Sequence, residues 1–594
     1  MNNKRSILPG LLLAATLAAC SRPAPTATQT ATTTAAKTTP TPVSIQTIAY
    51  ESDDTATDWK NQNPTAIELK GDTATVAGTN AAVTGNKVMI LSSGVYAISG
   101  KLTNGQIIVD VQNKGTVRLV LNGAEITSSD GPAIYVEKAD KTIITLPDGT
   151  KNVVADGKSH AQVAGEEDQP DAAIYSKDDV TINGTGALTV HGNYKDGLVS
   201  RDKLVITGGN LAVTAVDDGV MGRDQVVVKE GTINIEAGGD GIKSSNDTDP
   251  AKGYIALEGG TFVIKSGNDG LQAESSLQVT GGTYTITTGG GSAKAAVKVS
   301  ADGPMGGGPM GGRGQMPAAP AAPTTTATAT DKPSAKALKA KTDITITGGT
   351  FTIDSADDAI HSNSTVTIAG GQIAISSGDD GIHADTSIAI KSGKIEIAKS
   401  YEGIESKLIS YEGGETRLVS TDDGVNLAGG ADGSSMGGRP GQNSFSAGGT
   451  PMLQISGGHL AVNALGDGID VNGSLTMSGG TVVVSGPTAA MNGAVDYDGT
   501  FVMTGGMLVA AGSAGMAQAP SDTSSQYSIA MRFPSVHKAG TPVSLQDSQG
   551  KTLVTYVPPK EYQFVVFASP ELKKGAAYTL YTGGTSTGTL MDGL

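Results

Sequence analysis

Short stretches of alternating apolar and polar residues, separated by glycines, run along most of this chain. In residues 365–382, the segment TVTI precedes a Gly-Gly pair, IAI follows it, and another Ile follows an Asp-Asp-Gly turn. A period of two residues is typical of β-strands, and the glycines indicate turns between them. The pattern therefore predicts an all-β protein of short strands.

The same pattern returns about every 22 residues. The second glycine of the pair, or its equivalent, falls at positions 209, 231, 260, 282, 349, 371, 393, 414, 458, 480 and 506. Five of the ten intervals are 22 residues long. Three short strands in one such unit cannot bury their apolar faces alone, whereas stacked units share one continuous aliphatic core. The repeat predicts a parallel β-helix, a solenoid with about 22 residues per coil.

The N-terminus is built differently. Residues 1–19 combine a positively charged start, an apolar run too short to span a membrane comfortably, and the sequence LAA directly before Cys20. This resembles a bacterial lipoprotein signal, which implies cleavage before Cys20 and lipid attachment to its sulfur; an ordinary signal peptide with an incidental cysteine is the alternative. Residues 20–45 are rich in Thr, Ala and Pro and predict a flexible tether. We expect a protein of the bacterial cell envelope, held at the outer membrane or cell surface by its lipid alone.

The remaining chain divides by composition. We expect a small N-terminal β cap at 46–114, the β-helix at 115–526 and a C-terminal β cap at 527–594. Two insertions, 303–341 with Met/Gly-rich and Pro/Ala/Thr-rich parts and 429–449 with Gly-rich sequence, predict disordered loops that leave the repeat in phase. Caps at both ends argue against end-to-end polymerisation, so we expect a monomer.

The net charge of the chain limits the classes of ligand that it can bind. The formal charge is -16, which repels nucleic acid and anionic lipid and suits cations or neutral ligands. The one cysteine lies at position 20, so disulfides do not contribute to the predicted folded region.

Acidic residues recur at the same turn of successive units and are therefore expected to stack. Coils about 4.8 Å apart bring such carboxylates to a repulsion of roughly 3–4 kcal/mol per pair at an effective dielectric constant of 20. Two compatible interpretations relieve it: each Asp caps its turn by accepting backbone N–H bonds, or Ca²⁺ lies between coils. The candidate calcium ligands are Asp217, Asp218, Asp240, Asp247, Asp249, Asp269, Asp357, Asp358, Asp379, Asp380, Asp422 and Asp423.

A polar strip is predicted beside these acids. The residue after each Asp-Asp-Gly-apolar sequence should point outward, as should the residue two positions later. Since the coil rise is close to the length of one hexose, a polysaccharide lying along the axis could contact each coil; an ordinary solvated face is the alternative. The two histidines of the strip are expected to be surface residues rather than a metal pair. The candidate substrate-binding residues are Arg223, Lys243, Gln272, Glu274, His361, His383, Asp385, Glu405 and Lys407.

Longer segments carry a family resemblance. They include SGVYAISGKLTNGQIIVDV (93–111), VRLVLNGAEITSSDGPAIYV (117–136), GTGALTVHGNYKDGLVSRDKLVITGG (184–209) and SPELKKGAAYTLYTGGT (569–585). The chain resembles the carbohydrate-binding, polysaccharide-lyase-like β-helix family of secreted bacterial proteins. The resemblance implies a right-handed β-helix, bound Ca²⁺ and binding to plant-type polysaccharides such as cellulose or polygalacturonate.

Three functions stay open. The resemblance favours a Ca²⁺-dependent carbohydrate-binding protein. Related pectate lyases use a Lys or Arg as base, and Lys243 beside Asp240 is the candidate here, although no feature of the sequence requires it to be partly neutral. The third possibility is a structural or adhesive surface protein without glycan specificity.

Overall fold

The computed structural model describes residues 47–112, 115–161, 169–295, 333–427, 450–585, 588 and 591–594. Residues 45–594 form one compact unit. Cys20, the predicted signal and tether, and the predicted insertion at 429–449 lie outside the described residues, as does 303–332. In the part of the chain that is described, the secondary structure is β-strand plus a single 3-10 turn, Lys60–Gln62. None of the described helices is long and apolar enough to cross a membrane.

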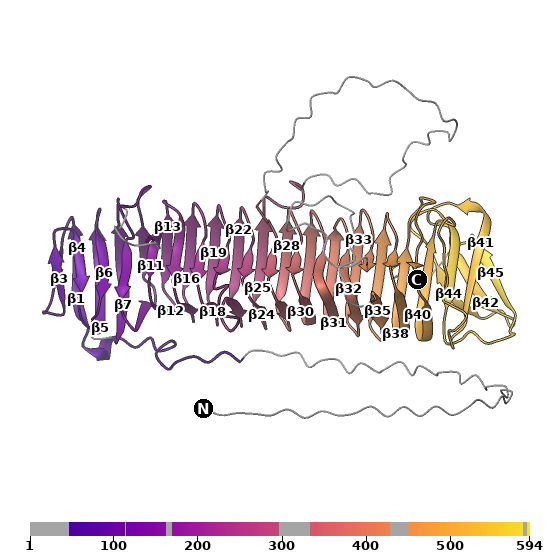
Figure 1. Ribbon diagram of the computed structural model, residues 1–594, viewed down its shortest axis with the longest axis horizontal. Helices are drawn as coiled ribbons and strands as arrows, with labels where there is room; N and C mark the ends of the chain where they lie inside the picture. Colours follow the sequence, from indigo (N-terminus) through magenta and orange to yellow (C-terminus); the bar gives the residue numbers. More distant parts are fainter. Residues whose placement is uncertain are drawn as a thin grey trace, which may run out of the picture. The chain divides into compact units, whose positions relative to one another are not determined.

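From β8 to β27, each strand of the long sheet pairs in parallel with the strand three places later in the chain. For example, β16 (Asn210–Ala215) pairs with β19 (Thr232–Ala237), and β17 (Val220–Gly222) pairs with β20 (Ile242–Ser244). Three strands therefore make one coil, and equivalent strands of successive coils form three rows. In Figure 1 the strands of one row, such as β13, β16, β19 and β22, follow one another along the long axis. This is the parallel strand arrangement that the 22-residue repeat predicts.

The rows are as follows. Row 1 contains β10 (Lys151–Ala155), β13 (Ala187–Gly192), β16, β19, β22 (Thr261–Ser266), β25 (Thr283–Thr288), β28 (Thr350–Ser355), β33 (Glu415–Ser420) and β36 (His459–Ala464). Row 2 contains β4 (Lys87–Ile90), β6 (Gln106–Asp110), β8 (Ile134–Lys138), β11 (Ala172–Ser176), β14 (Asp196–Ser200), β17, β20, β23 (Leu271–Ala273), β26 (Leu338–Ala340), β29 (Ile360–Ser362), β34 (Val425–Leu427), β37 (Ile469–Val471) and β39 (Asp496–Tyr497). Row 3 contains β9 (Lys141–Leu146), β12 (Asp179–Gly184), β15 (Lys203–Ile206), β18 (Gln225–Val228), β21 (Tyr254–Leu257), β24 (Leu277–Val279), β27 (Asp343–Ile346) and β35 (Met452–Ile455). Longer strands continue from one row into the next: β1 (Thr65–Gly71), β5 (Gly94–Leu102), β7 (Thr116–Thr127), β30 (Thr365–Ser377), β31 (Ile382–Lys399), β32 (Ile404–Tyr411), β38 (Ser474–Ser485) and β40 (Phe501–Gly512).

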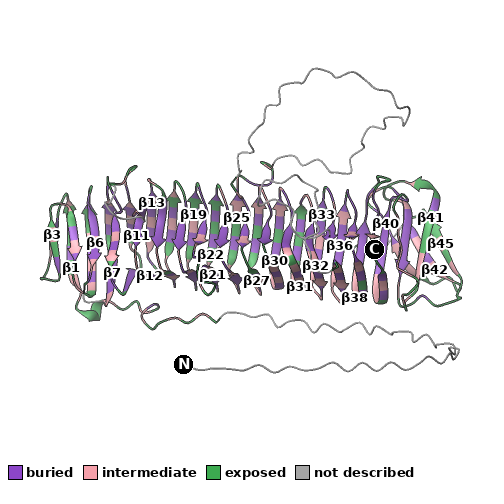
Figure 2. Ribbon diagram, in the orientation of Figure 1, coloured by how far each residue is buried: buried purple, intermediate pink, exposed green. Residues whose placement is uncertain are grey.

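The core is a stack of like residues on like residues. Ile235, Ile264, Ile286, Ile353 and Ile375 follow one another in register along row 1, and all are buried. Figure 2 shows buried residues along the whole stack of strands. Each fully buried Ile contributes about 1.5–3 kcal/mol, so the column of aliphatic side chains holds the coils together.

Aromatic rings form a second stack inside the coils. Phe262 and Tyr284 stack with ring centroids 4.7 Å apart, and Tyr284 and Phe351 follow at 4.5 Å. Two residues before each of these rings, a glycine makes the turn from row 3 to row 1. The φ of Gly349 is +99°, a backbone conformation that residues with side chains rarely adopt. Hence the second glycine of the repeated pair is required by the backbone.

Both ends differ from the simple repeat. At the start, β2 (Ala74–Val76) and β3 (Ala81–Thr84) pair antiparallel with β1 and β4. However, β1 already pairs in parallel with β5, and β4 with β6, so the parallel rows begin inside the region expected to be a cap. At the other end, β44 (Tyr562–Ala568) pairs antiparallel with β40 and β41 (Ser528–His537). A separate sheet follows, made of β42 (Val543–Asp547), β43 (Thr552–Tyr556) and β45 (Tyr578–Thr582).

One predicted boundary is wrong. Residues 333–341 were expected to belong to a disordered insertion, yet β26 pairs in register with β23 on one side and β29 on the other. These residues complete a coil, and they carry two lysines, Lys336 and Lys339, into the site described next.

Candidate functional site

A column of acidic residues lies at the turn that leads from row 1 into row 2. We call it the acid column; its members in chain order are Asp196, Asp218, Asp240, Asp269, Asp358, Asp380, Glu402, Asp423 and Asp467, with Lys336 in place of an acid between Asp269 and Asp358. The first acids of the repeated pairs, Asp217, Asp357, Asp379 and Asp422, each come one residue earlier.

The carboxylates of this column accept backbone N–H groups from the next coil. The N–H of Asp240 donates to Asp218 Oδ1 (2.7 Å), that of Asp380 to Asp358 Oδ1 (3.1 Å) and that of Asp467 to Asp423 Oδ1 (2.7 Å). The predicted role as backbone acceptors is therefore right, but the donor comes from the neighbouring coil rather than from the same turn. A backbone N–H carries no net charge, so this ladder leaves the carboxylates to be neutralised by other groups.

A second column lies beside the acid column on row 2. We call it the strip; its members are Met221, Lys243, Gln272, Lys339, His361, His383, Glu405, Asn426 and Asp470, in register on adjacent strands. Each strip residue follows its acid-column residue by three positions.

In the earlier coils the cations are lysines. Lys243 Nζ lies 3.0 Å from Asp218 Oδ2 and 2.9 Å from Asp240 Oδ2, and Lys339 Nζ lies 2.9 Å from Asp269 Oδ2. Lys336, whose side chain is 1% exposed, lies between Asp357 (2.8 Å) and Asp358 (2.9 Å). We call the part of the column from Asp218 to Asp358 the lysine-balanced segment.

Protonation in this segment follows from those pairs. Burial lowers the pKa of Lys336 and Lys243, but the adjacent carboxylates raise it more, so both pKa values lie above that of an ordinary lysine. Burial raises the pKa of Asp358, but Lys336 and His361 lower it well below the ordinary aspartate value. These lysines are thus ammonium ions at neutral pH. Lys243 does not fit the role of a general base, which must be able to take up a proton.

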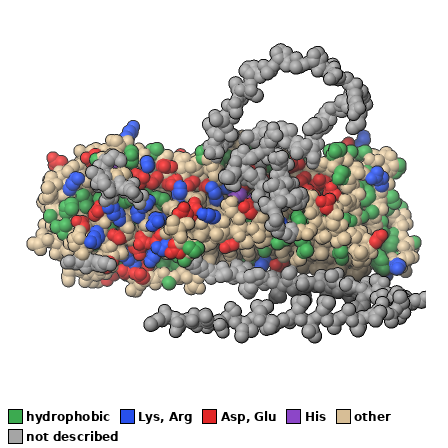
Figure 3. Space-filling model, viewed as in Figure 1, with side chains coloured by type: hydrophobic (Ala, Val, Ile, Leu, Met, Phe, Trp, Pro, Cys, Tyr) green, Lys and Arg blue, Asp and Glu red, His purple; other side chains and the backbone are tan. Residues whose placement is uncertain are grey.

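In the later coils the strip changes character. It carries His383, Glu405, Asn426 and Asp470 where the earlier coils carry Lys243 and Lys339. We call this part of the two columns, from Asp380 to Asp470, the acid-rich segment. Figure 3 shows Lys and Arg interspersed with Asp and Glu over the earlier coils, and a group of Asp and Glu on the later coils.

Burial and like charges raise the pKa of the carboxyls in the acid-rich segment. Burial and the nearby Glu405, Asp380 and Asp423 hold the pKa of Glu402 well above the ordinary glutamate value. For Asp423, burial followed by Asp422, Asp467 and Asp470 raises the pKa to about 9. A nearby cation favours the ionised form of such carboxyls.

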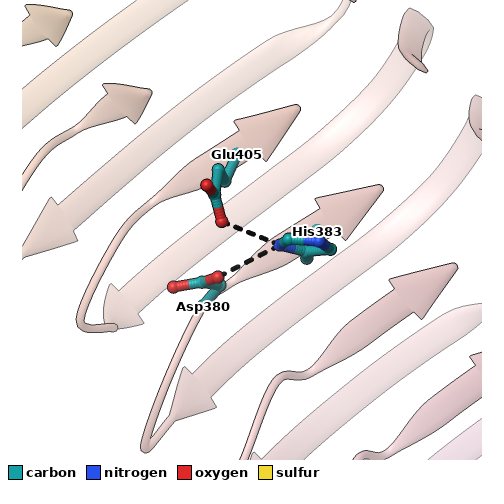
Figure 4. Close-up of side chains that lie close together, drawn as sticks. All are labelled: Asp380, His383 and Glu405. Carbon is teal, nitrogen blue, oxygen red and sulfur yellow. Dashed lines mark hydrogen bonds and ion pairs between the residues drawn. The ribbon is translucent and has the colours of Figure 1, made fainter. Parts of the chain in front are cut away.

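Two clusters in this segment bring candidate metal ligands within 4.8 Å of one another. One is Asp380, His383 and Glu405, drawn in Figure 4, and the other is Asp423, Asp467 and Asp470. A third cluster, Asp357, Asp358 and Asp379, already has Lys336 bound to two of its members.

Asn426 is the strip residue next to the all-carboxylate cluster, three residues after Asp423. It is 6% exposed and lies in register between Glu405 and Asp470. Its Nδ2 donates to Glu402 Oε2 (2.9 Å), whereas its buried Oδ1 has no hydrogen-bond partner among the described residues. An amide oxygen of this kind is a usual ligand of Ca²⁺.

The strip is not the solvated face that the sequence predicts. His361 and His383 are 2% and 0% exposed, with ring centroids stacked at 4.8 Å, and Gln272 (9%) and Glu405 (4%) are also buried. The histidines are therefore not surface residues; they lie among the carboxylates. The candidates that lie two positions after the strip residues are partly exposed. They are Arg223, Glu274, Asp385 and Lys407.

The structure does not bring Asp247 and Asp249 into the acid column. Both are exposed, and Asp249 Oδ1 accepts the N–H of Ala251 (3.0 Å) in their own loop. Asp240, another candidate calcium ligand, is paired with Lys243.

The sequence did not predict Lys336 and Lys339 as site residues, because their coil was assigned to the adjoining insertion. A signal was present: AKALKA at 335–340 has the small-apolar-polar-small order of the other coils, with lysine in place of the acid. It also did not place Asp467 and Asp470 among the metal ligands, although both follow the same phase.

The family of carbohydrate-binding domain-containing proteins matches residues 84–381, which is half of the chain. The chain belongs to this family. The matched region of this carbohydrate-binding family member contains the whole lysine-balanced segment and ends at the start of the acid-rich segment.

Individual relatives match a smaller share of this chain than the family as a whole does. A carbohydrate-binding domain-containing protein of Acetivibrio thermocellus is 40% identical over 133 residues, 22% of this chain and 46% of the relative. The chain thus matches about half the length of that curated relative. A solved structure of a polysaccharide lyase-like protein from C. thermocellum, a gadolinium derivative, aligns at 35% identity over 38% of this chain and 92% of its own, with a TM-score of 0.37.

Proposed function

We propose that this family member is a lipid-anchored, Ca²⁺-dependent polysaccharide-binding protein of the bacterial cell envelope, at the outer membrane or cell surface. Membership of the carbohydrate-binding family is the single observation that carries the binding function. The three-strand coils support the finer description of a parallel β-helix of about 22 residues per coil, and the family resemblance implies its right hand. The LAA-Cys20 sequence supports the lipid anchor, and we propose that the protein is a monomer.

Calcium is proposed for the acid-rich segment. Ca²⁺ takes six to eight oxygen ligands, and Asp423, Asp467, Asp470 and the unpartnered Oδ1 of Asn426 supply oxygens of the required kind. The residues therefore fit the ion. When bound there it would supply positive charge at the position where the lysine-balanced segment has its ammonium groups.

We further propose an acidic or plant-type polysaccharide, polygalacturonate or cellulose, as the ligand. A chain of net charge -16 repels a polyuronate, so binding of an acidic glycan needs a bridging cation. The partly exposed Arg223, Glu274, Asp385 and Lys407 lie beside the columns on four different coils and supply hydrogen-bonding groups along the axis. In the pectate-lyase alternative, the candidate base Lys243 is held as an ammonium ion by two carboxylates.

Retention on immobilised polygalacturonate and on cellulose tests this function. The full-length mature protein is applied with Ca²⁺ and with a chelator, and we expect Ca²⁺-dependent retention on polygalacturonate. Asp423→Asn should weaken that retention, whereas Lys101→Gln, a change at a surface ion pair with Glu125, should not. Equal failure to bind both polysaccharides under both conditions would instead support a structural or adhesive protein.

A further inference from the structure

We propose that Asp380, His383 and Glu405 form a separate site for a divalent transition metal of the zinc type. The three residues come from the turn before β31, from β31 and from β32. His383 Nδ1 lies 2.8 Å from Glu405 Oε2 and 3.3 Å from Asp380 Oδ2, and all three residues are buried. One imidazole nitrogen and two carboxylates thus converge on one point (Figure 4).

The other nitrogen of His383 gives the second, independent indication. His383 Nε2 lies 3.1 Å from Asp385 Oδ1, a carboxylate that is not part of the cluster. Histidines that bind metals through one nitrogen usually donate the other N–H to a carboxylate, which fixes the tautomer and the ring orientation. Asp385 therefore holds the proton on Nε2 and leaves the Nδ1 lone pair for a metal between Asp380 and Glu405.

His361 provides an internal comparison. It occupies the same position one coil earlier, and its Nδ1 lies 2.8 Å from Asp358 Oδ2. Asp358 is already paired with Lys336, and the buried Nε2 of His361 has no hydrogen-bond partner among the residues described. His361 thus lacks both the second carboxylate and the orienting carboxylate, so the arrangement around His383 is not a general feature of the strip.

A proton is the competing occupant. Without metal, an imidazolium at His383 can donate through Nδ1 to Glu405 and through Nε2 to Asp385. A metal bound at Nδ1 takes the place of that proton, so proton and metal compete for the same nitrogen. The metal adds a full positive charge where Asp380 and Glu405 would otherwise share one imidazolium.

The ligand set indicates the class of metal. Ca²⁺ and Mg²⁺ prefer all-oxygen sites, whereas imidazole combined with carboxylate suits Zn²⁺, Co²⁺ and related ions. This cluster should thus select a different ion from the all-oxygen cluster at Asp423, Asp467 and Asp470. The inference goes beyond the proposed glycan binding and does not depend on it.

Titration of the metal-free, full-length mature protein with Co²⁺, followed by visible absorption, tests the site. We expect one Co²⁺ per chain with a nitrogen–oxygen ligand spectrum, displaced by Zn²⁺ and retained in a large excess of Ca²⁺. His383→Gln should abolish the spectrum, and Asp385→Asn should weaken binding by about 10–100-fold. The matched control His361→Gln should keep the spectrum and the affinity, with circular dichroism showing that each variant folds.

Two results would overturn the site. One is a wild-type protein that binds no Co²⁺ or Zn²⁺, or that loses them to Ca²⁺; the other is a folded His383→Gln variant with an unchanged spectrum. If His383→Gln does not fold, X-ray absorption of the zinc-loaded wild-type protein decides: one imidazole nitrogen on zinc supports the site, and an all-oxygen shell contradicts it.

Discussion

The lysine-balanced and acid-rich segments share one backbone arrangement but differ in what neutralises their carboxylates. In both, a backbone N–H of the next coil donates to the carboxylate, as at Asp218 and at Asp423. In the first segment Lys243, Lys336 and Lys339 supply fixed positive charge. In the second, the equivalent strip positions hold a histidine, a glutamate, an asparagine and an aspartate.

This difference indicates a structural role for the lysine-balanced segment and an ion-binding role for the acid-rich segment. A hydrogen bond to a charged group contributes about 1.5–3 kcal/mol, whereas two carboxylates one coil apart repel by roughly 3–4 kcal/mol at an effective dielectric constant of 20. The N–H ladder alone therefore does not offset the repulsion. The lysine-balanced segment carries its own positive charge, and we propose that the acid-rich segment takes up protons or metal ions.

The largest expected effect is the removal of a buried lysine. Lys336→Met leaves the buried Asp358 without its ammonium partner and should lower the free energy of unfolding by about 3–5 kcal/mol. Urea denaturation measures the change. The double variant with Asp358→Asn should recover part of the loss, because Asn keeps an oxygen for the N–H of Asp380. A loss below about 1 kcal/mol, the range of surface pairs, would contradict the assigned role of Lys336.

The second effect should appear only in the acid-rich segment. Ca²⁺ at a hundredfold excess over its dissociation constant stabilises a protein by about 2.7 kcal/mol. Asp423→Asn should remove most of that gain, yet be neutral or stabilising in chelator because a neutral amide avoids the cost of protonating Asp423 on folding and keeps an acceptor for the N–H of Asp467. Thermal melts with Ca²⁺ and with chelator measure both. Asp240→Asn in the lysine-balanced segment is the matched control and should leave the Ca²⁺ shift intact.

A further effect is expected from pH. The pKa of Asp423 is raised from 3.8 to about 9, so between these values the folded metal-free protein holds a proton that the unfolded chain has lost. The free energy of unfolding should therefore fall as pH rises from about 4 to about 9 in chelator. Asp423→Asn should flatten this slope in denaturation curves taken across the range, and an equally steep slope in the variant would place the titration elsewhere.

The smallest effect is expected at the surface. Lys101 and Glu125 form an ion pair, but their side chains are 57% and 42% exposed. Lys101→Gln should change the free energy of unfolding by less than about 1 kcal/mol in the same urea experiment. A loss as large as that of Lys336→Met would show that burial does not distinguish the two pairs.

The strand arrangement was predictable because every coil repeats it. Residues such as Ile353 and Ile375 occupy the same phase of the alternation, and their register in the structure is that phase. The coil of β26 was not recognised, since its lysines replace the Asp-Asp-Gly sequence and it adjoins an insertion. Repetition thus predicts the fold wherever the repeated sequence survives, and fails where one coil changes its chemistry.

The site was predictable only in part. The alternation correctly placed the acids in one column, but it gives the direction of a side chain, not its neighbours. His383 is buried among Asp380 and Asp385 of its own coil and Glu405 of the next coil, and the sequence alternation does not show that these side chains meet. The pairing of Lys243 with two acids likewise depends on the spacing between coils.

The most direct test of the comparison is to install the lysine of one segment in the other. Asn426 stands three residues after Asp423, as Lys243 stands three residues after Asp240, whose carboxylate it contacts at 2.9 Å. The measurement is the shift of the thermal unfolding midpoint between chelator and Ca²⁺ for the wild type and for Asn426→Lys. Our account predicts a clear shift for the wild type and little or none for Asn426→Lys, which should be the more stable of the two in chelator. Equal shifts in both proteins, or no shift in the wild type, would contradict it.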